Sequence, residues 1–308
     1  MSGKALILTD GKAGHENQSK AFARALGLDF DLVEVHFRSR FHKALSYIFD
    51  YFHIYSLHST LLSLPSSFLL SPSSFLLTLA TGSGTFYAAK ALARTLGIKC
   101  GVVLYPRGYR LSTFDCILAP AFDRPEKRDN VIEIPANLVA NDEAFYEKGV
   151  NDFKSRSAVI PDIGVIIGGP NKCSSMSVEW MKGELDKIFL EPGTKAVTTS
   201  RRTPPEVEAL VDTYPWDYKL LYSKDHFNPI PAFVKLAKKL YVTAESTGML
   251  SEACTFGSAE VVALDNLNPG PHKFRRFVEN LIAGGYLNGA KKVDLSAQFA
   301  RARKLLGL

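Results

Sequence analysis

The sequence predicts an α/β protein built from two domains, each with a parallel β-sheet and crossover helices. The chain has 308 residues, a length at which one hydrophobic core usually gives way to two. From residue 4 onward, short apolar runs alternate with helical segments, as in parallel strands joined by helices. The same alternation restarts at Asp162. We therefore expect two domains joined around residues 140–160, with one large sheet as the alternative.

The first half of the chain opens with a strand, a glycine-containing loop and a helix. KALILT (4–9) is the strand, and a helix over 17–26 ends at Gly27, because glycine favours helix termination. A second strand follows at 31–36. Further elements are expected as strands at 78–81, 101–105 and 116–119 and a helix at 84–96.

The second half repeats this order. A buried strand at 162–167 precedes a helix at 177–190, and paired prolines start a helix at 204–213, where proline suits the first turn. The other expected elements are strands at 194–199, 218–222, 239–243 and 260–264 and helices at 232–238, 249–255, 272–283 and 294–306.

Composition limits the possible partners. The chain is 46% hydrophobic and 22% charged, as ordinary globular proteins are, with a net charge of +6. That mild excess suits an anionic ligand or membrane surface, and without clustered basic and aromatic residues we expect no nucleic-acid partner. No signal-peptide core is present at the start, so we expect a cytoplasmic protein. The cysteines are scattered, which predicts reduced thiols and no metal site: Cys100, Cys116, Cys173 and Cys254.

The stretch 44–79 interrupts the α/β alternation with many aromatic residues and leucines. It contains a repeat of period seven, PSSFLL at 65–70 and again at 72–77, whose prolines argue against a membrane-spanning helix. Basic residues precede it at Arg38, Arg40, His42 and Lys43. Two interpretations stay open: residues 38–79 contact an anionic membrane surface, or the stretch is core with a hydrophobic loop.

Residues 239–257 (KLYVTAESTGMLSEACTFG) predict a strand, a small polar turn and a helix. Backbone N–H groups at such a helix start favour an anion, typically phosphate, and Glu252 lies within reach of a neighbouring sugar hydroxyl. The alternative is an ordinary helix start capped by a hydroxyl side chain. The candidate residues of the turn are Glu245, Ser246, Thr247, Gly248 and Met249.

Two more loops are predicted at the same sheet edge. One follows the strand at 162–167 and contains Gly168, Gly169, Asn171 and Lys172. The other follows the strand at 194–199 and contains Ser200, Arg201 and Arg202, whose guanidinium groups are suited to phosphate. Two solvated arginines before a helix would be the alternative. Since ligands bind parallel sheets at the carboxyl ends of the strands, we expect a binding site for an anionic ligand there.

The loop after the first strand combines ionisable residues with glycines. Asp10, His15 and Glu16 are capable general bases, although a histidine near a helix start is often only a cap. The loop is neither a dinucleotide-binding glycine motif nor a P-loop. Its remaining residues are assigned to an acceptor-side loop: Gly11, Lys12, Gly14, Asn17 and Gln18.

Together these motifs resemble the mitochondrial-fission (elongated-mitochondria) family, whose bacterial members are regarded as glycosyltransferases. The matching segments are DGKAGHENQ (10–18), GGPNK (168–172), TTSRRTP (198–204), NP (228–229) and VTAESTGMLSEACTFG (242–257). The last is also similar to the donor-site helix of GT-B glycosyltransferases, especially the lipid-linked N-acetylglucosaminyltransferase of peptidoglycan synthesis. Two positions depart from the family pattern: Ile230 replaces an aromatic residue, and Glu245 replaces an aspartate.

The resemblance implies a GT-B fold, with two Rossmann-like domains facing each other across a cleft. The expected domains are an acceptor-side domain at 1–155, a nucleotide-sugar domain at 156–290, and a final helix in 291–308 that packs on the first domain. By the same resemblance, Glu252 contacts the nucleotide ribose, and Gly168 and Gly169 belong to the donor-phosphate site. His15 is the first candidate for the base and Asp10 the second.

We therefore expect a metal-independent glycosyltransferase without a cofactor, since the nucleotide-sugar is its substrate. It would transfer a hexosyl or related sugar to a lipid-linked or lipopolysaccharide-type acceptor at the inner face of the cytoplasmic membrane. One alternative is a nucleotide-sugar epimerase on the same fold. A second is a non-enzymatic membrane-associated adaptor of the fission type.

Overall fold

The computed structural model describes residues 3–63, 75–289 and 291–308, so most of the repeat at 65–77 lies outside the described residues. It divides into unit 1, Met1–Ala140 with Leu295–Leu308, and unit 2, Asn141–Asp294. The expected boundary at residue 155 falls inside helix α5 (Glu143–Arg156), which belongs to unit 2. The reason is packing: the ring of Phe153 on this helix lies 5.8 Å from that of Phe233.

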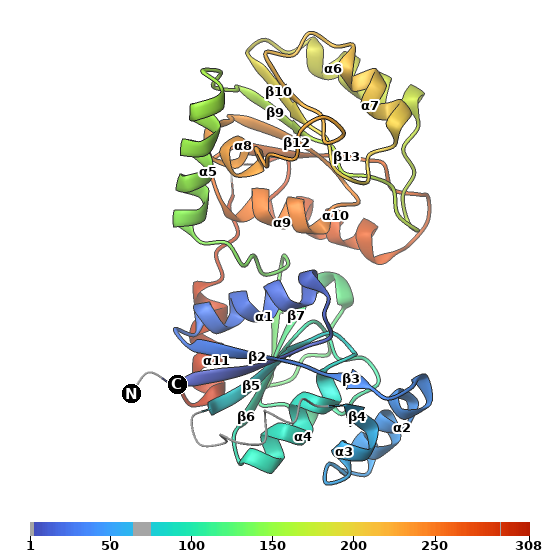
Figure 1. Cartoon of the computed structure of the whole chain (residues 1–308), viewed down its shortest axis with the longest axis vertical. Helices are drawn as coiled ribbons and strands as arrows, with labels where there is room; N and C mark the ends of the chain where they lie inside the picture. Colours follow the sequence, from blue (N-terminus) through green and yellow to red (C-terminus); the bar gives the residue numbers. More distant parts are fainter. Residues whose placement is uncertain (1–2, 64–74, 290) are drawn as a thin grey trace. The chain divides into compact units, whose positions relative to one another are not determined.

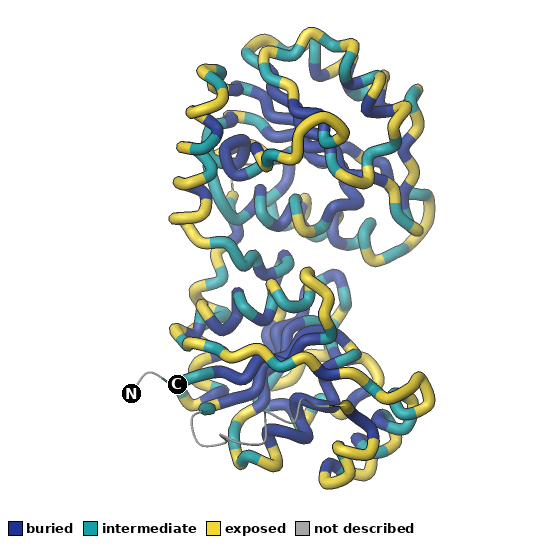
Figure 2. The backbone as a smooth tube through the Cα atoms, in the orientation of Figure 1, coloured by how far each residue is buried: buried dark blue, intermediate teal, exposed yellow. Residues whose placement is uncertain are grey.

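Unit 1 is built on a parallel sheet that, within the described residues, has six strands in the order β2-β1-β5-β6-β7-β8. Its central strands are buried on both faces, which explains their continuous apolar sequences (Figure 2). The strands are β1 (Lys4–Thr9), β2 (Asp29–Glu34), β5 (Phe75–Thr81), β6 (Lys99–Val103), β7 (Cys116–Pro120) and β8 (Val131–Ile134).

Helices cover both faces of this sheet. α1 (Ala13–Ala25) and α11 (Ser296–Leu306) pack on one face, where Phe22 and Leu306 join the core. α4 (Phe86–Leu96) packs on the other face (Figure 1). Helix α11 comes from the end of the chain, and its Arg303 donates a hydrogen bond to the Leu26 carbonyl at the end of α1.

An insertion separates β2 from β5. It consists of β3 (His36–Phe37), α2 (Arg40–Tyr51), α3 (His58–Leu61) and β4 (Leu62–Ser63), with β3 and β4 paired antiparallel. Helix α2 is not predicted by the sequence pattern, because its polar residues Ser46 and Asp50 are buried and do not mark a solvent face. In the described part of the chain, no helix combines the length and hydropathy needed to span a bilayer.

Unit 2 has a second parallel sheet, with five strands among the described residues in the order β11-β10-β9-β12-β13. α6 and α7 pack on one face, and α8 packs with α5 on the other (Figure 1). The strands are β9 (Ile163–Ile166), β10 (Lys195–Thr198), β11 (Tyr218–Leu220), β12 (Lys239–Thr243) and β13 (Glu260–Leu264). The helices are α5, α6 (Val178–Phe189), α7 (Pro205–Asp212), α8 (Ile230–Leu236), α9 (Thr247–Thr255) and α10 (Lys273–Ala283).

Both sheets reverse their strand order beside their first strand. In unit 1 the chain goes from β1 to β2 on one side and returns to β5 on the other. In unit 2 it goes from β9 to β10 and β11, then returns to β12. At such a switch point the flanking loops separate in opposite directions and leave a crevice in which α/β proteins bind ligands. Each unit therefore has one position where a ligand site is expected.

Candidate functional site

The switch point of unit 2 brings together the three loops that the sequence assigned to the donor. They follow β9, β10 and β12, which are neighbours in the sheet. The Thr203 hydroxyl donates a 2.6 Å hydrogen bond to the Gly168 carbonyl, which ties the arginine loop to the glycine loop. The Gly169 amide donates a 2.8 Å hydrogen bond to Glu245, which ties the glycine loop to the turn before α9.

Hydrogen bonds within the chain join the glycine loop to the turn that contains Glu245. The Gly168 and Gly169 amides are bonded to Thr243 Oγ1 and Glu245 Oε1, both at 2.8 Å, so they are engaged within the chain. The second oxygen of the buried Glu245 carboxylate accepts a 2.8 Å hydrogen bond from the Asn266 amide. Glu245 thus connects two segments that are distant in the sequence, at Gly169 and Asn266. Its side chain is longer than that of the aspartate in the family pattern.

Glycine is required at 168 and 169 by close approach rather than by an exposed amide. A Cβ at Gly169 would lie 2.0 Å from the Arg202 carbonyl oxygen, and one at Gly168 would lie 2.0 Å from Glu245 Oε1. At Gly169 only a backbone shift would relieve the clash, whereas at Gly168 the Glu245 carboxylate would have to leave its hydrogen bonds. The glycines allow the three loops to pack into one body.

The start of helix α9 has the free donors that the sequence predicted. Ser246 precedes the helix and makes no side-chain cap, and the Leu250 amide is the one that reaches the Ser246 carbonyl. Among the described residues, the amides of Thr247, Gly248 and Met249 have no hydrogen-bond acceptor. The alternative of a hydroxyl-capped helix start is therefore not what the structure has. These three amides lie at the positive end of the helix dipole, an arrangement suited to an anion.

The backbone at Gly248 is accessible, and the other two loops of this sheet edge carry basic side chains. A Cβ at Gly248 would meet nothing within 4 Å, so a ligand has room to approach the backbone. Lys172, Arg201 and Arg202 are exposed, and within the described residues none of them forms an ion pair. Asn171 and Ser200 instead shape their own loops, because Asn171 accepts from the Cys173 amide and Ser200 from the Arg202 amide.

Glu252 lies on helix α9 and is held by a tyrosine from α5. The Tyr146 hydroxyl donates a 2.8 Å hydrogen bond to Glu252 Oε1, and the buried tyrosine ring stacks on Phe256 at 4.3 Å. Burial raises the pKa of Glu252, against the opposing effect of its hydrogen bonds from Tyr146 and Asn141. The carboxylate is therefore held in a fixed orientation beside the start of α9.

The switch point of unit 1 holds an aspartate–histidine pair. Asp10 lies at the end of β1, and its Oδ1 lies 3.0 Å from His15 Nδ1 on the first turn of α1. The Lys12 ammonium lies 2.6 Å from Asp10 Oδ2. Burial opposes ionisation of Asp10, but the hydrogen bonds from Lys12 and His15 outweigh it and lower the pKa of Asp10. An ionised Asp10 directs the Nδ1–H of His15 toward itself and leaves Nε2 as the basic nitrogen.

Glycines of the next loop support this pair, and the sequence analysis missed them. The loop follows β5, and a Cβ at Gly82 would lie 2.4 Å from the His15 ring. Gly84 similarly makes room for Asp10, which would lie 3.0 Å from an added Cβ. The signal that could have found them is TGSG (81–84) directly after an apolar strand, the same arrangement as in the loop at 168–169.

The other predicted residues of this loop have different roles. Glu16 forms a 2.6 Å ion pair with Lys20 along the helix, so His15 has the stronger geometry for a base. Gly11 adopts a φ of 76°, which glycine favours. Asn17 is exposed, and a Cβ at Gly14 would meet nothing within 4 Å. Gln18 Oε1 is buried without a hydrogen-bond partner among the described residues.

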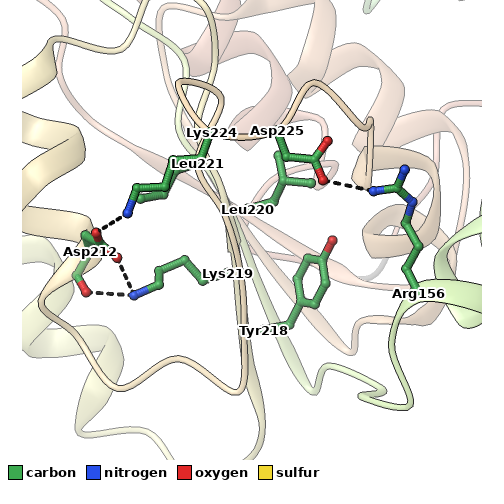
Figure 3. Close-up of a pocket in the computed structure, with 8 residues that line it drawn as sticks. All are labelled: Arg156, Asp212, Tyr218, Lys219, Leu220, Leu221, Lys224 and Asp225. Carbon is green, nitrogen blue, oxygen red and sulfur yellow. Dashed lines mark hydrogen bonds and ion pairs between the residues drawn. The ribbon is translucent and has the colours of Figure 1, made fainter.

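A separate cavity of about 270 Å³ lies beside the edge strand β11 and contains none of the predicted site residues. Figure 3 shows Lys219 and Lys224 on either side of Asp212, and Arg156 directed to Asp225. The hydrogen bonds from the two lysines lower the pKa of Asp212 to about 2. Because its charges are paired with each other, this cavity lacks the free donors found at α9. Within the described residues, no group of three or more His, Cys, Asp or Glu could hold a metal ion.

Comparison with known proteins adds the family and the fold. The family model described as Mitochondrial fission ELM1 matches residues 13–302. A putative UDP-N-acetylglucosamine 2-epimerase from Listeria monocytogenes has a similar structure, with a TM-score of 0.55, 11% identity, and coverage of 100% of this chain and 89% of that chain. No curated protein matches the sequence significantly.

Two plant glycosyltransferase structures are similar to a comparable degree. Arabidopsis thaliana UGT89C1, complexed with UDP-L-rhamnose, has a TM-score of 0.55 and 10% identity, and the match covers 99% of this chain and 89% of that chain. Medicago truncatula UGT71G1, complexed with UDP-glucose, has a TM-score of 0.51 and 8% identity, with coverage of 99% and 90%. At such low identity these likenesses establish the fold, and they confirm the expected GT-B class.

Proposed function

Because the chain belongs to the Mitochondrial fission ELM1 family and has a GT-B fold, we propose that it is a metal-independent glycosyltransferase. The donor is a nucleotide-activated hexose or related sugar, and no further cofactor takes part. The acceptor is lipid-linked or of the lipopolysaccharide type, at the cytoplasmic face of a membrane. Glycosyltransferases with bound UDP-sugars among the structural neighbours support the choice of donor.

The observation that carries the proposal is the uncapped start of helix α9 beside Glu252. The free amides of Thr247, Gly248 and Met249 would receive the donor diphosphate, and exposed Arg201, Arg202 and Lys172 would add positive charge. Glu252 lies one turn further along α9, where its carboxylate would accept hydrogen bonds from ribose hydroxyls. Charge that develops on the leaving nucleotide would then be stabilised by a preformed set of dipoles.

The first unit would supply the base. His15 Nε2 would take the proton from the acceptor hydroxyl while Asp10 stabilises the resulting imidazolium. The oxygen of the acceptor would attack the anomeric carbon, and the bond from that carbon to the nucleotide phosphate would break. Lys12 would keep Asp10 ionised during this step.

A nucleotide-sugar epimerase is the second candidate, favoured by the likeness to the Listeria protein. It shares the donor site but needs no acceptor. Product analysis separates the two activities: an epimerase interconverts free nucleotide-sugars, whereas a transferase releases nucleotide only when an acceptor is present. A non-enzymatic adaptor would not require the nucleotide site at all.

Calorimetric titration with UDP, CMP, GDP and ADP tests the site, using the intact chain and a Glu252→Ala variant. We expect one nucleotide to bind, and the variant to bind it about tenfold or more weakly, as for a lost hydrogen bond to a charged group. Glu260→Ala, at an exposed position at the start of β13, is the matched control and should bind normally. Absence of binding by all four nucleotides would reject both enzymatic proposals.

A further inference from the structure

Helix α2 packs Leu45, Tyr47 and Phe49 against the core, but it also buries polar side chains and exposes a row of apolar ones. Ser46 and Asp50 are completely buried, and they point away from solvent on one side of the helix. The opposite side carries Phe41, which is 67% exposed, and Ile48. Phe52, the residue that ends the helix, is 63% exposed on the same side, since positions 41, 48 and 52 repeat at helical spacing. A soluble surface helix normally has the opposite arrangement.

A buried ion pair fixes this orientation. Asp50 Oδ1 lies 2.7 Å from the Lys90 ammonium and accepts a 2.7 Å hydrogen bond from the Tyr55 hydroxyl. Asp50 Oδ2 accepts a 2.6 Å hydrogen bond from the Arg110 amide, and Ser46 bonds to the Tyr109 hydroxyl at 3.0 Å. Turning the helix to hide its apolar side would leave the buried Lys90 ammonium without its carboxylate partner, which is strongly unfavourable. The apolar face is therefore held outward.

The charge around this face has one sign. Between residues 36 and 63 the only acidic residue is Asp50, which is buried, whereas Arg38, Arg40 and Lys43 are basic. The Arg110 guanidinium also lies over the exposed Tyr51 ring, 4.8 Å from its centroid. Aromatic side chains bordered only by positive charge are complementary to the interface of an anionic bilayer.

The insertion is also linked to the candidate catalytic loop. The Lys43 ammonium on α2 donates a 2.9 Å hydrogen bond to the Ser83 hydroxyl. Ser83 lies between the two glycines that make room for His15 and Asp10. A surface bound by α2 would thus lie next to the loop that holds the proposed base.

We infer that helix α2 is a membrane-docking element, with Phe41, Ile48 and Phe52 inserted into the interface of an anionic bilayer. The benefit of docking rests on the proposed function, since a docked unit 1 would be close to a lipid-linked acceptor. Arg38 and Arg40 bind the lipid headgroups. The Lys90–Asp50 ion pair keeps this apolar face exposed in the protein before it binds a bilayer.

Flotation with vesicles of equimolar phosphatidylglycerol and phosphatidylcholine, compared with phosphatidylcholine alone, tests the inference on the full chain. We expect binding to the anionic vesicles and little to the neutral ones. Phe41→Ala/Phe52→Ala should lower the partition coefficient about tenfold or more, because both rings lose apolar contact. Arg40→Glu should lower it at least about fivefold, as expected for a basic residue at an anionic surface.

Leu190→Ala is the matched control, because Leu190 is 86% exposed but lies on unit 2, at the end of α6. It should leave flotation unchanged. Near-ultraviolet circular dichroism and nucleotide titration show whether the α2 variants remain folded. Equal binding by wild type and the Phe41/Phe52 variant, or equal binding to both vesicle types, would overturn the inference.

Two further outcomes separate this inference from the proposed function. If nucleotide binds but anionic vesicles do not, α2 docking is wrong and the transferase proposal stands. If the chain instead forms a dimer in sedimentation velocity that Phe41→Ala/Phe52→Ala abolishes, with no vesicle binding, the face is a protein interface and the inference is again overturned. If vesicles bind and nucleotides do not, docking holds and the transferase proposal fails.

Discussion

The two switch points of the molecule share a topology but contain different chemistry. In unit 1 the crevice beside β1 holds ionisable side chains, with His15 fixed by Asp10 and Lys12. In unit 2 the crevice beside β9 holds main-chain amides at the start of α9. The buried carboxylate of Glu245 is hydrogen-bonded to Gly169 and Asn266, so it connects the loops. Under the proposed function this is a division of labour, in which one unit moves a proton and the other stabilises negative charge.

Both units use glycine for the same purpose, to bring a second loop within contact distance. At Gly82 the neighbour is a side chain, the His15 ring, whereas at Gly169 it is the Arg202 carbonyl. A side chain can change rotamer more easily than a backbone can move. Gly82 also has a φ of 89°, so both glycines should resist substitution, one through backbone conformation and the other through a backbone clash.

The largest effect is expected from the base. His15→Ala should lower sugar transfer, followed as nucleotide release in the presence of acceptor membranes, by about 10²–10⁴-fold. Nucleotide affinity should stay unchanged, because the donor site belongs to unit 2. Glu16→Gln is the control, since Glu16 is paired with Lys20, and it should retain most of the activity. Equal losses for both variants would break the assignment of His15.

Gly169→Ala should destabilise unit 2 and weaken nucleotide binding together. The new methyl group would clash with the Arg202 carbonyl, and overpacking of this kind costs about 1–3 kcal/mol in the free energy of unfolding. Gly183→Ala on helix α6 provides the contrast, because its Cβ meets nothing within 4 Å. That variant should be more stable by up to about 1 kcal/mol. Urea unfolding measures both, and a stable Gly169→Ala protein would refute the close packing of the three loops.

Tyr146→Phe should weaken nucleotide binding about fivefold, because Glu252 loses the hydroxyl that orients it, worth roughly 1 kcal/mol. The comparable variant Tyr214→Phe removes a hydrogen bond to Asp186 on helix α6. It should not affect nucleotide binding. Calorimetry compares the two. If Tyr214→Phe weakens binding as much as Tyr146→Phe does, orientation of Glu252 is not the cause.

The smallest effect concerns stability and pH. Burial raises the pKa of Glu252 above its ordinary value, so the folded chain binds this proton more tightly than the unfolded chain does. Stability from this group is therefore full below the unfolded pKa of about 4.5 and is lost as pH rises through the folded pKa. Glu252→Gln should melt a few degrees higher than wild type at neutral pH, while binding nucleotide less well. The difference should shrink on acidification toward pH 4.5, and a lower melting temperature at neutral pH would contradict it.

The sequence predicts strands better than it predicts contacts between loops. The strands at 4–9, 239–243 and 260–264 have the expected bounds, because each is a short apolar run that differs from its polar flanking residues. Helix α2 was missed because its buried side mixes polar and apolar residues, and α5 because few of its residues are buried. The free amides at α9 follow from local sequence, whereas the role of Glu245 depends on Gly169 and Asn266, which are distant in the chain.

The return of helix α11 to unit 1 has a consequence for biosynthesis. Unit 2 is formed by one continuous stretch, Asn141–Asp294, and its whole chain leaves the ribosome before residues 295–308 do. Until then unit 1 lacks Ala302 and Leu306, which fill one face of its sheet, and the Phe299 ring that stacks on Phe22. Unit 1 is thus synthesised before unit 2 but completed after it. While unit 2 is being synthesised, the apolar surface of unit 1 that α11 covers in the folded protein would be exposed.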